Sequence, residues 1–177
     1  MKGYYNQPEL TAEAIDKEGW FHTGDTGYFD PDGYLFITGR TKSMFKTSMG
    51  KYINPEVIEE KMKQSPFVLD MMVVGADQKF AAAVIAPDFD MLKDWCRRHG
   101  VKAETKEEMI ADKTVIGRYQ KVMDKYIVEL GVTEQVKKFV LVADTWSEAN
   151  KFLTPTQKLI RRNVAAAYQE QIDALFK

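Results

Sequence analysis

Two apolar runs separated by a short turn segment constrain the fold of this chain most strongly. Residues 71–74 and 80–86 are wholly apolar, and they bracket Gly75-Ala76-Asp77-Gln78-Lys79. Short apolar runs bounded by turn residues are typical of buried strands. The two segments are therefore predicted to pair as strands of a core sheet.

Helical periodicity follows these strands at residues 91–98 and again at residues 107–130, and a further apolar strand is expected at residues 139–142. With 177 residues, of which 45% are hydrophobic, the chain is long enough to bury a core. Strands and helices in this mixed order predict an α+β fold class, a small mixed α/β domain.

Two hairpins are expected before this region. Aromatic and β-branched residues at 27–29 and 34–38 flank Asp30-Pro31-Asp32-Gly33, in which Pro fixes φ and Gly permits a positive φ. Another short strand is expected at residues 20–22. The second hairpin would have Ser48-Met49-Gly50 at its turn, and a helix capped by Asn54 would follow it.

The last segment shows the clearest helical pattern. Thr154, Pro155 and Gln157 fit a capping box with proline at the first helical position, which predicts a helix that begins at Pro155 and carries Lys158 in its first turn. Apolar residues then recur every fourth position and predict a face turned to the core. They are Ile160, Val164, Tyr168, Ile172 and Phe176.

Composition excludes several classes of protein. The net charge of -1 argues against phosphate-backbone binding, although residues 1–40 hold three basic and seven acidic side chains and the remainder 22 and 19. Cys96, His22 and His99 have no partner at metal-binding spacing, so no protein-held metal is expected. The longest apolar run is too short to cross a bilayer, and the first residues form no signal peptide. We expect a cytoplasmic protein, with peripheral membrane association left open.

Three segments together resemble the C-terminal third of an acyl-CoA synthetase. They are Trp20-Phe21-His22-Thr23-Gly24-Asp25, the stretch from Gly39 to Glu59, and Leu153-Thr154-Pro155-Thr156-Gln157-Lys158. The resemblance is to the adenylate-forming, AMP-binding enzymes and is strongest to their long-chain fatty acid branch. It implies that residues 1–40 are the truncated end of a large N-terminal adenylation domain and that residues 41–177 are a mobile C-terminal domain.

The resemblance gives roles to residues near the first hairpin. Asp25 matches the family's aspartate that binds the ribose hydroxyls of ATP and AMP, and Thr23 matches a small polar residue near the nucleotide. Arg40 matches a nucleotide-contacting arginine, and Lys42 stands at the hinge about which the C-terminal domain swings. By their residue types alone, these would be a turn, a surface salt bridge and a solvated lysine.

The stretch Thr47-Ser48-Met49-Gly50-Lys51 is not a phosphate-binding P-loop, because the spacing would require glycine at Phe45 and a hydroxyl residue at Tyr52. The resemblance instead places Gly50, with Lys51 nearby, beside the channel for the pantetheine arm of CoA. Tyr52 stands where other relatives carry a phosphate-contacting arginine, so that contact is not carried over.

Lys158 matches the family's catalytic lysine, whose ammonium stabilises the acyl carboxylate and the α-phosphate in the transition state. Many relatives have glycine before this lysine, where this chain has Gln157. The Leu-Thr-Pro-Thr form followed by a residue other than glycine is typical of the long-chain branch.

The implied reaction joins a fatty acid to CoA through an acyl-adenylate, with release of AMP and pyrophosphate. Its cofactors would be ATP, bound with Mg²⁺, and CoA, and its partner would be the missing N-terminal domain. The chain alone is expected to lack appreciable ligase activity. Two alternatives stay open: transfer of the acyl group to a carrier protein by the same chemistry, and a stand-alone, non-catalytic binding module.

Overall fold

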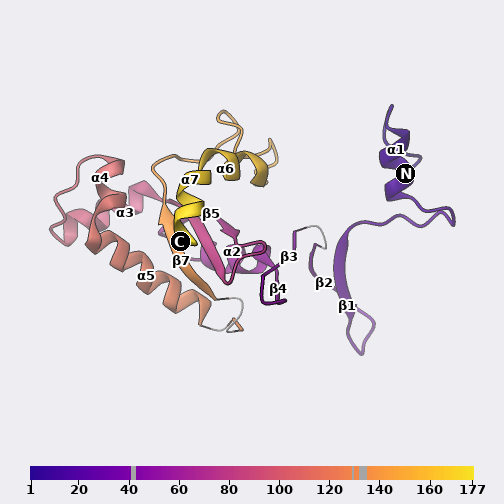
Figure 1. The fold of residues 1–177 in the computed structure, drawn as a ribbon, viewed down its shortest axis with the longest axis horizontal. Helices are drawn as coiled ribbons and strands as arrows, with labels where there is room; N and C mark the ends of the chain where they lie inside the picture. The colour runs from indigo at the N-terminus through magenta and orange to yellow at the C-terminus, as the bar shows by residue number, and fades with distance from the viewer. Residues whose placement is uncertain (41–42, 129, 132–134) are drawn as a thin grey trace. The chain divides into compact units, whose positions relative to one another are not determined.

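The computed structural model describes residues 1–40, 43–128, 130–131 and 135–177. The chain divides into two compact units, Met1–Met44 and Phe45–Lys177, and each is described by itself (Figure 1).

The first unit contains one short helix and one hairpin. Its elements are α1 (Pro8–Ala14), β1 (Asp25–Phe29) and β2 (Leu35–Arg40). β1 and β2 pair antiparallel with Tyr28 opposite Phe36. The Asp30 carboxylate accepts the backbone N–H groups of Asp32 at 3.0 Å and Tyr34 at 2.9 Å, which closes the turn. The predicted first hairpin is therefore confirmed.

The expected strand at residues 20–22 is wrong. Only an isolated bridge pairs Phe21 with Ile15. The Asp16 carboxylate accepts the N–H groups of Glu18 at 3.0 Å and Trp20 at 2.9 Å, so this segment folds back on itself as a local turn.

None of the side chains of residues 1–37, 43 and 44 is buried. Tyr5, Trp20 and Phe29 are 91%, 71% and 70% exposed. Large aromatic side chains normally leave water when a domain folds, so the described side chains of this unit form no hydrophobic core of their own.

The second unit begins with the predicted second hairpin, formed by β3 (Phe45–Lys46) and β4 (Tyr52–Ile53). Helix α2 (Pro55–Lys63) follows, and the Asn54 side chain accepts the N–H of Glu56 at 3.2 Å, as a helix cap should. Pro55 at the first helical position has no backbone N–H, but an N–H at this position would have no partner within the helix, so no helical hydrogen bond is lost.

The core is a three-stranded sheet of β5 (Val68–Val74), β6 (Ala81–Pro87) and β7 (Val136–Leu141). β5 and β6 are antiparallel, as the two apolar runs predicted, and β7 lies parallel to β6 on its other side. Every residue of β6 is buried, because helices cover both faces of the sheet. Figure 1 shows α5 on one side of the sheet and α6 with α7 on the other.

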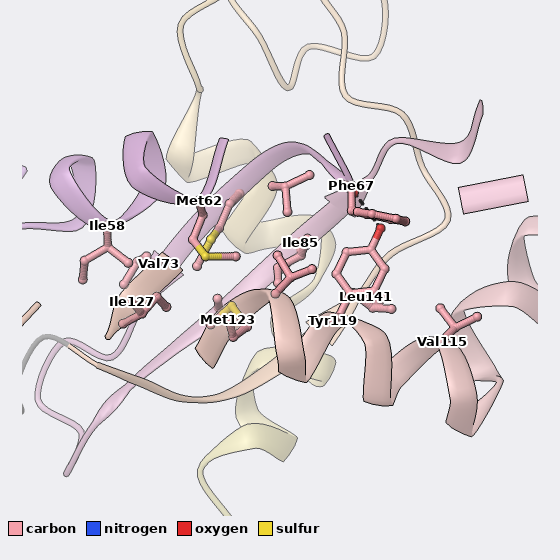
Figure 2. Close-up of a cluster of buried hydrophobic side chains, with 14 of the residues drawn as sticks. Ile58, Met62, Phe67, Val73, Ile85, Val115, Tyr119, Met123, Ile127 and Leu141 are labelled. Carbon is pink, nitrogen blue, oxygen red and sulfur yellow. Dashed lines mark hydrogen bonds between the residues drawn. The ribbon is translucent and has the colours of Figure 1, made fainter. Parts of the chain in front are cut away.

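The larger cluster of buried side chains lies between the sheet and the helices α2, α3 (Phe89–Arg98) and α5 (Lys113–Ile127). In Figure 2, Tyr119 of α5 reaches the start of β5, where its hydroxyl donates to the Phe67 carbonyl at 2.6 Å. The predicted helix at 107–130 is divided into α4 (Lys106–Ala111) and α5, because Asp112 has an extended ψ of 128° and caps α5 through Thr114 and Val115.

The second face is covered by α6 (Arg161–Ala167) and α7 (Gln169–Leu175). Val164, Tyr168 and Ile172 are buried there, so the predicted apolar face is confirmed. The predicted helix start at Pro155 is wrong. Residues 154–158 form a tight loop, α6 begins at Arg161, and the helix breaks at Tyr168.

Candidate functional site

Lys158 lies at the end of a tight loop whose backbone is fixed by hydrogen bonds. The N–H of Thr154 donates to the Lys158 carbonyl at 2.8 Å, and the N–H of Gln157 donates to the Thr154 carbonyl at 2.8 Å. The Thr154 hydroxyl accepts the N–H of Lys158 at 3.0 Å. Leu153, which is buried, pairs with Leu159 across the loop. The loop is therefore anchored in the core on one side and presents Lys158 to solvent on the other.

The Lys158 side chain is exposed. Within the described ranges, no hydrogen bond or ion pair engages its ammonium group, so its charge is available for an anion. A lysine whose backbone is held while its ammonium group is uncommitted keeps a positive charge within reach of one region of the domain surface.

Gln157, directly before Lys158, has a left-handed backbone with φ of 59°. This is the conformation that glycine adopts without strain and other residues adopt at a cost. It gives a physical reason for a glycine at this position in other chains. In this chain the hydrogen bonds that Thr154 makes with Gln157 and Lys158 offset the backbone strain at Gln157.

Gly50 and Lys51 lie in a loop with the same pattern of hydrogen bonds. The N–H of Gly50 donates to the Thr47 carbonyl at 2.9 Å, and the N–H of Thr47 donates to the Lys51 carbonyl at 2.8 Å. The Thr47 hydroxyl accepts the N–H of Lys51 at 3.2 Å. Gly50 has the left-handed φ, of 82°.

The two lysine-bearing loops are thus built alike. Each has threonine four residues before the lysine, and a left-handed residue directly before the lysine. This is the three-residue hairpin loop in which a turn is followed by a left-handed residue. The spacing Thr-x-x-x-Lys occurs in both segments. This shared spacing could have indicated two loops of the same kind, but the sequence-based prediction did not use it.

A buried carboxylate that the sequence-based prediction missed is hydrogen-bonded to Arg161, three residues after Lys158. Glu59 of α2 is 7% exposed, and its Oε2 accepts from Nη2 of Arg161 at 2.5 Å. Its Oε1 accepts the N–H of Val73 at 2.6 Å. Burial raises the pKa of the Glu59 carboxyl, while Arg161 and the Val73 N–H oppose that rise.

Thr23 and Asp25 lie at the start of β1 in the first unit. The Thr23 hydroxyl accepts the N–H of Asp25 at 3.0 Å, and Gly24 between them has φ of 77°. Asp25 lies opposite Arg40 in the register of the hairpin. The structure therefore brings the backbones of Asp25 and Arg40 together. The side chain of Arg40 and the whole of Lys42 lie outside what the structure describes.

Next to Thr23 is a hollow of about 470 Å³. It is lined by residues of the first unit alone: Tyr4, Leu10, Glu13, Ala14, Phe21, His22, Thr23 and Gly24. Its walls include the aromatic side chains of Tyr4 and Phe21, and Asp25 directly follows the lining residue Gly24 in the sequence.

No group of three or more metal-binding side chains gathers in the part of the chain that the structure describes. Cys96 is buried, and burial raises the pKa of its thiol, which disfavours the reactive thiolate. No helix of the described residues is long and apolar enough to cross a membrane.

Comparison with known protein families gives one assignment. The profile described as AMP-binding enzyme C-terminal domain matches residues 43–177.

Among curated proteins, long-chain-fatty-acid–CoA ligase 1 of Cavia porcellus is 38% identical over 179 residues, which cover 99% of this chain and 26% of that protein. A putative fatty-acid–CoA ligase of Mycobacterium tuberculosis is 35% identical over 177 residues, covering 99% of this chain and 31% of that protein. The chain thus spans between a quarter and a third of the length of these relatives.

Solved structures agree with the fold. The A domain of carboxylic acid reductase from Segniliparus rugosus, in complex with AMP and a co-purified carboxylic acid, matches with a TM-score of 0.78 and 26% identity over 99% of this chain and 26% of that chain. The A-PCP didomain of the same enzyme, in complex with AMP, matches with a TM-score of 0.75 and 27% identity over 98% of this chain and 23% of that chain.

Proposed function

The chain belongs to the AMP-binding enzyme C-terminal domain family, and on this premise we propose that it is the C-terminal part of an ATP-dependent long-chain fatty acid–CoA ligase. The names of the curated relatives, which match almost the whole chain, support the fatty acid and CoA as substrates. The observation that carries the proposal is Lys158, an exposed lysine whose backbone is fixed by Thr154 within the matched domain.

In the first step, an oxygen of the fatty acid carboxylate attacks the α-phosphate of ATP. The new O–P bond gives acyl-AMP, and the bond to the β-phosphate breaks to release pyrophosphate. Lys158 would contribute its ammonium to the negative charge that gathers on the carboxylate and the α-phosphate. Mg²⁺ enters with ATP as part of the substrate, to neutralise the phosphates.

In the second step, the CoA thiol attacks the acyl carbonyl carbon, loses its proton and displaces AMP. Gly50 and Lys51 would then line the path of the pantetheine arm, and Lys42 would be the hinge that exchanges the Lys158 loop for the Gly50 loop. The similarity of the two loops supports this exchange, because each offers a lysine on an equally fixed backbone.

Thr23, Asp25 and Arg40 would bind the nucleotide. A carboxylate has two oxygens that can accept the two hydroxyl groups of a ribose. Asp25 sits at the start of β1, where the bond from its N–H to the Thr23 hydroxyl fixes the backbone. The guanidinium of Arg40 would supply paired donors to ribose or phosphate oxygens.

We further propose that residues 1–40 end a large N-terminal domain and that residues 41–177 form the mobile domain. The lack of buried side chains among residues 1–37 supports this, since exposed aromatic side chains need a neighbour to cover them. The isolated chain would then make no acyl-CoA. Measurable ligase activity of the purified chain would contradict this.

The test of the catalytic role is Lys158→Ala in the full-length enzyme. Formation of acyl-AMP should fall at least about a hundredfold, as when other transition-state donors are removed, while thioester formation from supplied acyl-AMP should persist. Lys151→Ala is the control, because Lys151 is an exposed lysine of the same segment. Unchanged adenylation in Lys158→Ala would refute the role of Lys158.

A second candidate acceptor is a carrier protein. The match to an A-PCP didomain favours this second candidate. The thiol of a carrier protein would replace the thiol of CoA in the second step, and the first step would be unchanged. Purified full-length enzyme loaded with acyl-AMP and offered CoA and a carrier protein together would decide between them. Acyl transfer to CoA alone would exclude the carrier.

A further inference from the structure

Glu59 joins three elements that are far apart in the sequence. It lies on α2, its Oε1 binds the N–H of Val73 on β5 at 2.6 Å, and its Oε2 binds Arg161 at the start of α6 at 2.5 Å. Nη1 of Arg161 also approaches the Val73 carbonyl at 3.5 Å. Both oxygens of a buried carboxylate are thereby used, as burial of a charge requires.

The start of α6 has this contact and no side-chain cap. Ile160 precedes the helix, and no side chain there accepts an N–H of the first turn. Arg161, the first helical residue, is instead tied to the sheet and α2 through Glu59. The ion pair therefore engages the residue at which the helix begins.

Lys158 is linked to this point by a continuous set of backbone bonds. Leu159 pairs with Leu153, and the N–H of Ile160 donates to the Phe152 carbonyl at 2.8 Å. The carbonyl of Ile160 then accepts the N–H of Val164 at 3.2 Å inside α6. The two residues that follow the Lys158 loop therefore lead directly to Arg161.

We propose that Glu59 is a positioning residue for Lys158, acting through Arg161, which holds the downstream end of the Lys158 loop against the sheet. This inference rests on the proposed function of Lys158 in adenylation. α2 also follows the Gly50 hairpin directly, so the same ion pair joins the two segments that carry Lys51 and Lys158. Both loops would thereby move as one body with the domain.

The matched control is a second buried carboxylate on the same contact between α2 and β5. Asp70 is 8% exposed and forms an ion pair with Lys63 of α2. Like Glu59, it bridges α2 and β5, but its partner lies on α2 itself and not on α6. Asp70→Asn therefore removes a comparable charge without touching the Lys158 loop.

The first measurement is hydrogen exchange of the chain itself, comparing Glu59→Gln with Asp70→Asn. In Glu59→Gln one acceptor becomes an amide donor, so it can no longer accept from both Val73 and Arg161. Exchange at the N–H groups of Gln157, Lys158 and Ile160 should accelerate about tenfold in Glu59→Gln and stay unchanged in Asp70→Asn. Equal acceleration in both variants, or none in Glu59→Gln, would overturn the proposal.

The second measurement separates the two half-reactions in the full-length enzyme. Glu59→Gln should lower kcat for acyl-AMP formation about tenfold with little change in KM for ATP, and leave thioester formation from supplied acyl-AMP unaffected. Arg161→Met removes the partner instead and should give the same split. Should Glu59→Gln fold poorly, Arg161→Met carries the test.

Three results are informative. An equal loss in both half-reactions would show a merely structural role and overturn the proposal, as would faster exchange at Lys158 with normal adenylation. If Lys158→Ala itself left adenylation intact, the proposed function would fail, while the exchange data would still report whether Glu59 holds the loop. The two failures are thus distinguishable.

Discussion

The hydroxyl of Thr154 accepts the backbone N–H of Lys158 at 3.0 Å, and the backbone N–H of Thr154 donates to the Lys158 carbonyl at 2.8 Å. One threonine thus satisfies both backbone groups of the proposed catalytic lysine. The ammonium is left for the substrate, while the backbone that carries it is held.

Removal of this hydroxyl should loosen the loop. Thr154→Val keeps the shape of the side chain but leaves the N–H of Lys158 without its acceptor, which should cost about 1 kcal/mol of stability. Thr154→Ser keeps the hydroxyl and is the control. Urea unfolding of the chain, followed by tryptophan fluorescence, measures both. Equal losses in the two variants would mean that the methyl group, and not the hydrogen bond, matters.

The two left-handed positions should respond in opposite senses to exchanged residues. Gly50→Ala forces a residue with a Cβ to adopt φ of 82°, and this backbone strain should destabilise the domain by about 1 kcal/mol. The estimate includes no steric clash, because the nearest atom to the new Cβ is Lys46 Cε at 3.8 Å. Gln157→Gly relieves the strain at φ of 59° and should be neutral or stabilising. Thermal unfolding of both variants checks this. A marked loss in Gln157→Gly would show that the glutamine side chain has a role of its own.

Gly117 offers a stabilising substitution. It lies within α5, and a Cβ at this position would meet nothing within 4 Å. Gly117→Ala should therefore raise the free energy of unfolding by about 1 kcal/mol. Gly75→Ala is the contrasting variant, because its Cβ would lie 2.6 Å from the Phe80 carbonyl oxygen, at φ of 136°. It should destabilise strongly, and a harmless Gly75→Ala would contradict the close approach of the β5–β6 turn.

Alkaline pH should destabilise the domain through Tyr119. Burial raises the pKa of its hydroxyl far above the ordinary value of 10, so the folded chain keeps a proton that the unfolded chain loses. The contribution of this proton is complete below pH 10 and is lost as the pH rises further, by up to about 1.4 kcal/mol per pH unit. Stability measured from pH 9 upward should fall less steeply in Tyr119→Phe.

Two features bear on that experiment. Tyr168 adds to the same slope, because burial and the bond from its hydroxyl to Asp144 at 2.7 Å raise its pKa as well. At pH 7, Tyr119→Phe should cost about 1 kcal/mol for the lost bond to Phe67. An alkaline slope as steep in the double variant Tyr119→Phe/Tyr168→Phe as in the parent would refute the assignment.

Local signals predicted the local elements. The Asp-Pro-Asp-Gly turn, the Asn54 cap and the two apolar runs each appear where the sequence indicated, because backbone preference and short-range hydrogen bonds suffice to form them. The same kind of reasoning erred at Thr154. A threonine followed by proline fits a helix start and also a tight turn, and pairing of Leu153 with Leu159 selected the turn.

The sequence by itself determined the family and the α+β class, and the resemblance to that family gave Asp25, Gly50, Lys51 and Lys158 as candidates, because the motifs that carry the resemblance are short and contiguous. Only the tertiary structure decided that Lys158 sits on a hairpin loop and that Glu59 binds Arg161, 102 positions away. Such contacts form because burial brings distant segments together and requires every charge it encloses to find a partner.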